Sequence, residues 1–260
     1  MAELSTLFVS HGAPDLPLSE LPARRALEDL GRSLPRPDAI VIVSAHWEAP
    51  LVSVGEAEQH RTIYDFAGFD PQLRQLRYPA PGSPWHVEQV RGYLSRAGYE
   101  PQVSRDRGLD HGAWVPLLLM FPAADIPVIP VSLLRGVSLA AQRQLGAALA
   151  PLRSQNILVI ASGSPTHNLH ALRPEGTVPE RWALEFMAWL SRTVRSGNLN
   201  ALENYRSLAP HAATAHPSEE HLAPLLIAWG AGGGGPNKIL HESFSYGNLA
   251  MGVYGFGGGE

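Results

Sequence analysis

Four short apolar runs, separated by helical patterns, restrict the fold of this chain more than any other feature of its sequence. The runs are rich in β-branched residues, are long enough for one buried strand each, and cover residues 4–10, 39–44, 126–133 and 157–162. Helical patterns occupy residues 22–34, 83–98, 138–149 and 180–195. Strands that alternate with helices form βαβ units. We therefore predict an α/β fold, a single domain over residues 1–260 with a mostly parallel central sheet flanked by helices.

Local signals refine this prediction. Ser83 before Pro84 is typical of a helix N-terminus, and Gly98 suits the end of the same helix. Pro127 and Pro130 interrupt the third apolar run, and proline cannot donate to a sheet ladder, so we expect an edge strand or an irregular one there. The glycine-rich segment 230–235 lacks the Lys-Ser/Thr pair of a phosphate-binding loop, so we expect a flexible turn and no nucleotide.

The composition excludes several classes of protein. With 45% hydrophobic and 17% charged residues, the chain can bury a core and is not disordered as a whole. A net charge of −4 argues against binding to nucleic acid or to anionic membranes. The absence of cysteine removes disulfides, thiolate zinc sites, iron–sulfur clusters and cysteine nucleophiles. No apolar run approaches the roughly 18 residues of a membrane span and no signal peptide is apparent, so we expect a cytoplasmic protein.

Three of the eleven histidines follow predicted strands. His11 comes directly after the first, His46 after the second, and His167 a short loop after the fourth. The carboxyl ends of parallel strands lie at one edge of a sheet, and ligands bind just outside that edge. We therefore predict that these three imidazoles, distant in sequence, meet at one metal site at the carboxyl edge.

Two further histidines are grouped with them. His111 precedes the apolar segment 113–121, and His221 precedes the apolar segment 222–229. Ser218 suits a helix N-cap, which would place His221 one turn into a helix, where the positive helix end favours a neutral imidazole. Pro224 is compatible only if it falls within the first turns, so the helix could begin later.

Imidazoles without sulfur ligands suit Fe(II), Zn, Mn or Ni. Such a site with open positions is the layout of non-haem iron oxygenases, whereas zinc in the same site would activate water for hydrolysis, and the ligand type leaves both open. The chain has no G-x-S-x-G elbow, which argues against a serine hydrolase. We expect ordinary structural roles for the remaining histidines considered, His60, His86, His170, His211 and His241.

Several short motifs, in order along nearly the whole chain, resemble those of the class III extradiol ring-cleavage dioxygenases, most closely the branch of the 4,5-DOPA extradiol dioxygenases. The motifs are Ser10-His11-Gly12, Ser44-Ala45-His46-Trp47, Tyr64-Asp65-Phe66, Tyr78-Pro79-Ala80-Pro81-Gly82, Asp110-His111-Gly112-Ala113-Trp114, Ala161-Ser162-Gly163 with His167-Asn168-Leu169, and Glu220-His221-Leu222. The resemblance implies opening of a catechol ring beside its two hydroxyls with both atoms of O₂, giving a muconic semialdehyde.

The resemblance also implies roles for individual residues. His11, His46 and His221 match metal ligands, and His167 matches an acid–base histidine that zinc-bound members can use as a further ligand. His111 matches a catalytic histidine on the substrate side. The implied cofactor is one divalent ion, Fe(II) for catalysis, with Zn(II) able to occupy the site. More distant members use a carboxylate as third ligand, whereas this chain offers His221 with Glu220 beside it.

The expected partners are a small aromatic diol and O₂, with no nucleic acid and no membrane, and the expected assembly is a monomer or a small homo-oligomer. Trp47, Trp114 and Tyr64 could line an aromatic pocket, although core packing is the simpler role for such residues. Two alternatives from other classes remain at this point. One is a zinc-dependent hydrolase that uses the same histidines, and the other is a non-catalytic ligand- or peptide-binding module of the same superfamily.

Overall fold

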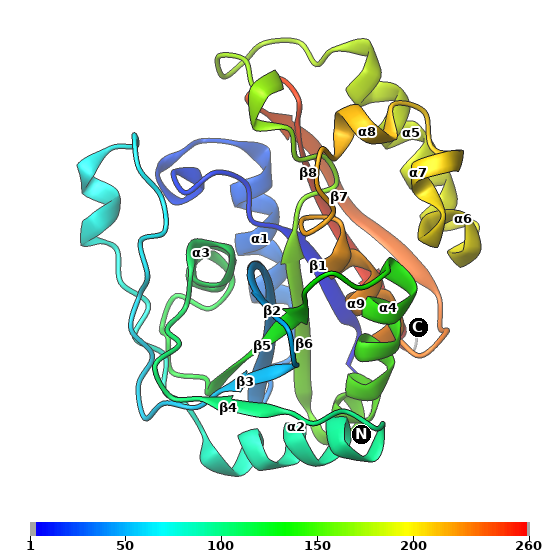
Figure 1. Ribbon diagram of the computed structural model, residues 1–260. Coiled ribbons are helices and arrows are strands. Elements are labelled where there is room, and N and C mark those ends of the chain that lie inside the picture. Colours follow the sequence, from blue (N-terminus) through cyan, green and yellow to red (C-terminus); the bar gives the residue numbers. More distant parts are fainter. Residues whose placement is uncertain (1–3, 259–260) are drawn as a thin grey trace.

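A single eight-stranded sheet organises the molecule. The computed structural model describes residues 4–258, and its strands follow the order β4-β3-β5-β2-β6-β1-β8-β7 across the sheet (Figure 1). Their bounds are β1 Thr6–Ser10, β2 Ala39–Ala49, β3 Ser53–Gly55, β4 Gln102–Ser104, β5 Val128–Leu134, β6 Ile157–Gly163, β7 Asn237–Ser245 and β8 Leu249–Phe256. The four central strands β5, β2, β6 and β1 pair in parallel, which confirms the predicted α/β class.

Alternate residues of the central strands enter two separate cores, one on each face of the sheet. On β2, Val41 and Val43 join one core, while Ile40 and Ile42 join the other. All four side chains are almost completely buried. A strand covered on both faces needs apolar side chains at every position, which is why these strands appear in the sequence as continuous apolar runs.

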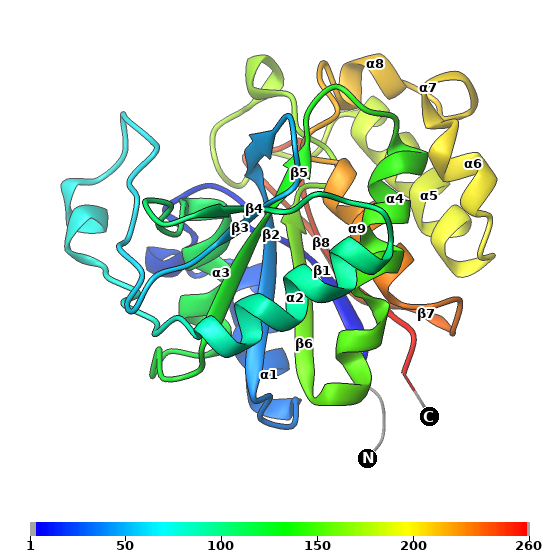
Figure 2. The same cartoon turned by 60° about the horizontal axis from the view of Figure 1, so that its bottom comes forward.

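Helices cover both faces of the sheet. In Figure 1, α1 and α3 lie on one side while α4 and α9 lie on the other, and Figure 2 shows α2 crossing in front of the strands. The helices are α1 Pro22–Ser33, α2 Pro84–Arg96, α3 His111–Met120, α4 Leu139–Leu149, α5 Arg181–Arg195, α6 Leu199–Glu203, α7 Tyr205–Leu208, α8 Ala212–Ala215 and α9 Ala223–Ala231. Short 3-10 turns are η1 Leu16–Leu18, η2 Pro71–Gln75, η3 Ala150–Gln155 and η4 Leu169–Ala171. None of the helices within residues 4–258 has the length and apolar character needed to cross a bilayer.

The predicted helix ends are largely confirmed. The Ser83 side chain accepts a hydrogen bond from the amide of His86 at the start of α2, and Gly98 takes a φ of +89° after its end. The helix start suggested at Ser218 is not observed, and the later start that Pro224 left open is confirmed, because α9 begins at Ala223. Pro224 explains the later start, since proline is tolerated only in the first turn of a helix. His221 consequently lies in the turn that leads into the helix.

The prediction of an edge position for the third apolar run was wrong. β5 lies inside the sheet, between β2 and β3. It pairs with β3 only at Val54 and Val131, beside Pro130. A side chain at Gly55 would collide with the Pro130 ring, at 2.5 Å from its Cγ, so the glycine leaves room for the proline. The proline is tolerated because the ladder on that side is limited to a single pair.

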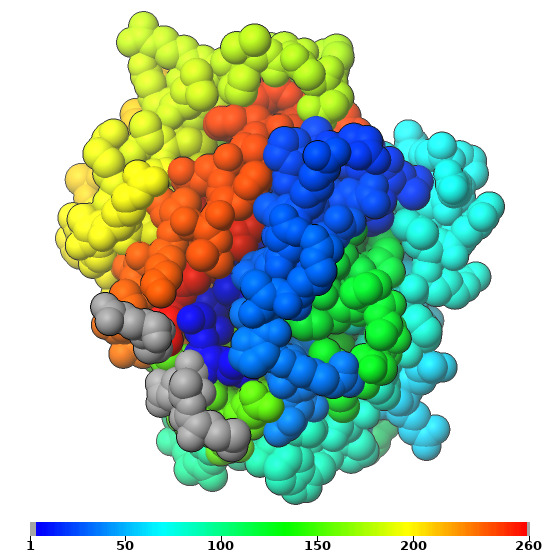
Figure 3. Space-filling view, turned by 180° about the vertical axis from the view of Figure 1, so that it is seen from behind, coloured from blue at the N-terminus to red at the C-terminus, as the bar shows by residue number. Residues whose placement is uncertain are grey.

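The C-terminal hairpin of β7 and β8 was not predicted. β8 pairs antiparallel with β1, so the two ends of the chain meet inside the same sheet. Figure 3 shows the N-terminal segment in blue beside the orange and red C-terminal strands. β8 is buried along its whole length, and its neighbour β7 closes the sheet with alternating exposed and half-buried residues. The hairpin therefore protects the edge that β1 would otherwise leave open.

Candidate metal centre

The carboxyl ends of three neighbouring strands bring the predicted histidines together. β2, β6 and β1 are adjacent and parallel. His11 follows the last residue of β1, His46 lies near the end of β2, and His167 comes four residues after β6. His11 and His221 are almost fully buried, and His46 is partly exposed. The structure brings His11, His46 and His221 into one cluster that could hold a metal ion, and it places His167 in a separate group with Glu220 and His221.

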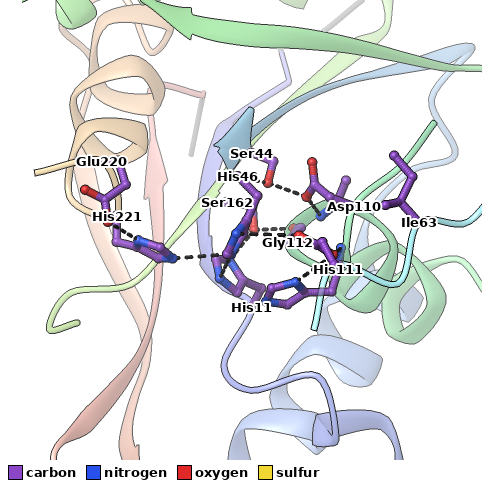
Figure 4. A network of polar contacts seen from close by, with 12 residues as sticks. His11, Ser44, His46, Ile63, Asp110, His111, Gly112, Ser162, Glu220 and His221 are labelled. Atoms are coloured by element: carbon purple, nitrogen blue, oxygen red, sulfur yellow. Dashed lines mark hydrogen bonds and ion pairs between the residues drawn. The ribbon is translucent and has the colours of Figure 1, made fainter. Parts of the chain in front are cut away.

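The Nε2 atoms of the three histidines lie at distances suited to one ion. The Nε2 of His46 is 3.2 Å from the Nε2 of His11 and 3.3 Å from the Nε2 of His221. Two nitrogens that bind one zinc ion tetrahedrally at about 2.0–2.1 Å would be roughly 3.3 Å apart. The spacing of the three donors is therefore that of a metal site, and Figure 4 shows their rings converging.

Hydrogen bonds fix the protonation of His11. Its Nδ1 lies 2.9 Å from the hydroxyl oxygen of Ser162, and that hydroxyl donates its own proton to the carbonyl of Gly112. Since the serine proton is already used, the serine oxygen accepts and His11 carries its proton on Nδ1. The lone pair of Nε2 is left free to bind a cation, as expected for a metal-binding histidine with an outer hydrogen-bond partner.

Carboxylates orient the other two rings in the same way. The Glu220 carboxylate accepts a hydrogen bond from Nδ1 of His221 at 2.9 Å. Asp65 lies 3.6 Å from Nδ1 of His46, an ion-pair distance that is too long for a hydrogen bond. Both carboxylates favour a proton on Nδ1, so Nε2 of each ring also presents a lone pair to the centre.

Three lone pairs directed at one point repel one another unless a cation lies between them. Protonating Nε2 would relieve the repulsion, but burial and the neighbouring imidazoles hold the pKa of His11 and of His221 well below the ordinary value. Burial also lowers the pKa of His46, to about 4. The three rings are therefore neutral near pH 7, the form that binds metal. The donor set fits a divalent transition metal such as Fe(II) or Zn(II).

His111 forms a dyad with Asp65 beside this cluster. Both the backbone amide and Nδ1 of His111 donate to one oxygen of Asp65, each at 3.0 Å. Burial would raise the pKa of Asp65, but the hydrogen bonds and the charge of His111 lower it to about 2, so the carboxylate stays ionised. The Nε2 of His111 is the ring nitrogen left for a substrate. Sequence reasoning did not assign a role to Asp65, although it lies in the motif Tyr64-Asp65-Phe66.

His167 stacks on His221. The two ring centroids are 3.4 Å apart, and the planes differ by 6°. The backbone amide of His167 donates to the carbonyl of Ala215 at 2.8 Å, which holds the loop after β6 in place. Burial lowers the pKa of His167 against the opposing charge of Glu220. His167 forms a separate group of possible ligands with Glu220 and His221, so its double role as acid–base and ligand stays a prediction.

Two glycines allow the chain to pass close to the cluster. A Cβ atom at Gly112 would lie 2.8 Å from the ring of His46, and it would also collide with the Ser44 hydroxyl. A Cβ atom at Gly163 would collide with the carbonyl oxygen of His221. That carbonyl accepts a hydrogen bond from the amide of Ser164 at 2.9 Å, which joins the end of β6 to the turn before α9.

A buried carboxylate supports the His46 segment from behind. Asp110 caps the N-terminus of α3 by accepting from the amide of Ala113, and it also accepts from the Ser44 hydroxyl at 2.6 Å. Arg107 pairs with Asp110 and donates to the carbonyl of His46 at 3.4 Å. The network links β2 to α3 and holds His46 next to His111, with ring centroids 4.1 Å apart.

A cavity of about 650 Å³ opens beside the cluster. Four of the predicted site residues line it, namely His11, His46, His111 and His167. Its apolar walls come from Phe66, Phe69, Leu169, Leu172 and Leu249. Trp47, Trp114 and Tyr64 are not among its lining residues, and Trp114 is fully buried in the core. The volume suits a small organic ligand.

The remaining histidines lie elsewhere. His60 donates to the carbonyl of Val128 and His211 donates to the carboxylate of Glu185, whereas His86 and His241 each share a hydrogen bond with a nearby serine hydroxyl. His216 is completely buried, and its Nε2 lies 2.8 Å from the carbonyl of Pro165. His170 is exposed in the short turn η4. None of these six histidines lines the cavity, and the structural roles expected for His60, His86, His170, His211 and His241 stay predictions.

The sequence and the fold both match proteins of known family. The family model described as the catalytic LigB subunit of aromatic ring-opening dioxygenase matches residues 22–257. A protein of Beta vulgaris named 4,5-DOPA dioxygenase extradiol is 38% identical over 258 residues, with 96% of each chain covered. A protein of the same name from Escherichia coli K12 is 34% identical, with 95% of this chain and 93% of its own covered.

A solved structure has the same architecture. The crystal structure of the uncharacterized protein JW3007 from Escherichia coli K12 matches with a TM-score of 0.82 and 32% sequence identity. The match covers 98% of this chain and 100% of that one. The similarity therefore extends over the whole sheet and its flanking helices, including the segments that carry the histidine cluster.

Proposed function

This chain belongs to the LigB family of aromatic ring-opening dioxygenases and is an extradiol enzyme of that family, and we propose that it opens the ring of a DOPA-like catechol with O₂. Both oxygen atoms enter the product, a muconic semialdehyde. One observation carries the proposal. The Nε2 atoms of His11 and His221 lie 3.2 and 3.3 Å from the Nε2 of His46, and all three donors lie within 4.8 Å of one another, beside a cavity whose walls are mostly apolar and aromatic.

We infer that His11, His46 and His221 hold one divalent ion, Fe(II) in the active enzyme, and that Zn(II) can occupy the same site. A bound dication lowers the pKa of hydroxyl groups that coordinate it and offers positions for diol and O₂. The outer partners Ser162, Glu220 and Asp65 keep the three rings in the tautomer that binds metal.

His167 and His111 supply proton transfer in this proposal. Both line the cavity, from different sides of the cluster, since His167 follows β6 and His111 begins α3. His167 accepts a proton from one substrate hydroxyl. Asp65 holds Nδ1 of His111, and the Nε2 of His111 exchanges a proton with the oxygen atoms of the reacting substrate. The apolar wall of Phe66 and Phe69 holds the ring and excludes water.

The test is anaerobic loading with Fe(II), followed by addition of air and L-DOPA, with an oxygen electrode and absorbance in the visible range. We expect one O₂ consumed per catechol and a yellow product. An iron-filled protein that consumes no O₂ with any of a panel of catechols would refute the proposal. Cleavage of esters or amides by the zinc form without O₂ would instead support the hydrolase alternative, and binding of catechol without turnover by the iron form would support the binding module.

A further inference from the structure

Two carboxylates of the cavity, those of Asp15 and Asp70, pair with no lysine or arginine among the described residues, and Asp15 is the one without a main-chain partner for its carboxylate. Asp15 lies in the loop after β1, four residues beyond His11, and lines the same cavity. No ion pair joins it to a lysine or arginine within residues 4–258, and the one hydrogen bond to its carboxylate in that range comes from the hydroxyl of Tyr246. Four residues span at most about 14 Å, which limits how far the backbone of Asp15 can lie from that of His11.

Tyr246 is held firmly in the turn between β7 and β8. It adopts a φ of +48°, in the left-handed region that non-glycine residues rarely occupy. Its amide donates to Glu175 at 2.9 Å, and its carbonyl accepts from the amide of Arg173 at 2.9 Å. Backbone strain persists where surrounding contacts enforce it, and it is common at ligand sites. The turn thus fixes the phenol that orients Asp15.

The charges around the cavity have one sign. Three carboxylates line it, those of Asp15, Asp65 and Asp70, and its lining contains no lysine or arginine. Asp65 is engaged by His111, and Asp70 caps η2 by accepting from the amide of Gln72 at 2.8 Å. The nearby guanidinium of Arg173 pairs with Glu180. Burial and the charge of Asp15 raise the pKa of Tyr246, so its phenol remains a donor to the carboxylate. Asp65 and Asp70 are held by main-chain amides, whereas the carboxylate of Asp15 is held only by a phenol that lines the same cavity, so we take Asp15 as the carboxylate available to a ligand.

We propose that Asp15, oriented by Tyr246, binds a positively charged amine on the side chain of the substrate, so that the enzyme prefers catechols that carry a protonated amine, as DOPA does, to catechols that carry none. The inference rests on the proposed function, because it assumes that the diol lies at the histidine cluster. The apolar walls would then hold the ring between the two polar ends of the cavity. A catechol whose side chain carries a carboxylate and no amine would meet no cationic side chain of the lining and would be repelled by Asp15.

Binding to the zinc-loaded protein without O₂ tests this inference separately from turnover. Isothermal titration calorimetry would compare dopamine, which is cationic, with neutral 4-methylcatechol and anionic 3,4-dihydroxyphenylacetate. We expect dopamine to bind most tightly and the anion most weakly. For Asp15→Asn, the ratio of the Kd of 4-methylcatechol to that of dopamine should fall about tenfold, as for loss of a charge-assisted hydrogen bond.

Asp70→Asn is the matched control, because it removes the same charge from the same cavity while asparagine can still cap η2. Its Kd ratio should stay at the wild-type value. An equal fall in both variants would overturn the assignment to Asp15, and so would wild-type protein that binds dopamine no better than 4-methylcatechol. If none of the three catechols binds, the proposed function fails as well, whereas binding of all three with equal affinity refutes the amine site alone.

Discussion

Ser162→Ala tests whether the three histidines form a metal site whose affinity depends on hydrogen bonds behind the ligands. Ser162 is completely buried, accepts from Nδ1 of His11 and donates to the carbonyl of Gly112. Alanine removes only the hydroxyl. His11 keeps its place but loses the partner that fixes its tautomer, so its Nε2 carries a proton more often and binds metal less tightly.

The size of the effect follows from the number of partners lost. Removing one outer hydrogen-bond partner of a metal ligand lowers affinity by roughly 10–100-fold, which is about 1.4–2.7 kcal/mol. Only one of the three rings is affected, since Glu220 and Asp65 still orient His221 and His46. The same change leaves the Gly112 carbonyl without its donor, and we expect a loss of about 1–3 kcal/mol in the free energy of unfolding.

Competition with a chromogenic chelator measures the Kd for Zn(II) in the wild type and the variant, and circular dichroism checks the fold. Ser164→Ala is the matched control. Ser164 is a buried serine two residues away whose hydroxyl donates to the carbonyl of Thr166 and contacts none of the ligand rings. We expect it to lose stability but to keep its zinc affinity. A folded Ser162→Ala protein with the zinc affinity of the wild type would refute the reasoning.

Four further variants test other features of the structure. His167→Ala should keep its Fe(II), measured by metal analysis, while turnover collapses, because His167 lies outside the cluster of His11, His46 and His221; loss of the metal would make it a ligand. Gly163→Ala should lower the free energy of unfolding by about 1–3 kcal/mol in chemical denaturation, because its Cβ would collide with the carbonyl of His221. Gly92→Ala on α2 should raise it by about 0.5–1 kcal/mol, because the new Cβ collides with nothing and alanine favours a helix. Equal effects of the two variants would contradict this explanation. Burial lowers the pKa of His216 from 6.5 to about 3 in the folded protein. As the pH falls below 6.5 the unfolded chain binds a proton that the folded protein does not, so the free energy of unfolding should decrease by about 2 kcal/mol at pH 5. Denaturation at pH 7 and pH 5 should show a smaller decrease for His216→Phe than for the wild type, and an equal decrease would refute the assignment to His216.

Most of the sheet could be predicted from local sequence. The central strands are buried on both faces, and that burial requires continuous apolar runs that stand out along the chain. The hairpin of β7 and β8 was missed because β7 is half exposed, and its side chains alternate in burial. The interior position of β5 was missed because a proline only limits the number of hydrogen bonds that its strand can donate. It does not show whether a second strand lies beside it, and β3 does so through a single pair of residues.

The sequence by itself determined that His11, His46 and His167 lie at one edge of the sheet, because parallel strands carry their carboxyl ends to the same side. Tertiary structure alone decided which nitrogens face one another and which groups hold them. Ser162, Asp65 and Asp15 act through partners 151, 46 and 231 positions away along the chain. Hydrogen bonds of that kind depend on distances of about 3 Å set by the packing of whole elements, and a pattern of residue types along a chain carries no such information.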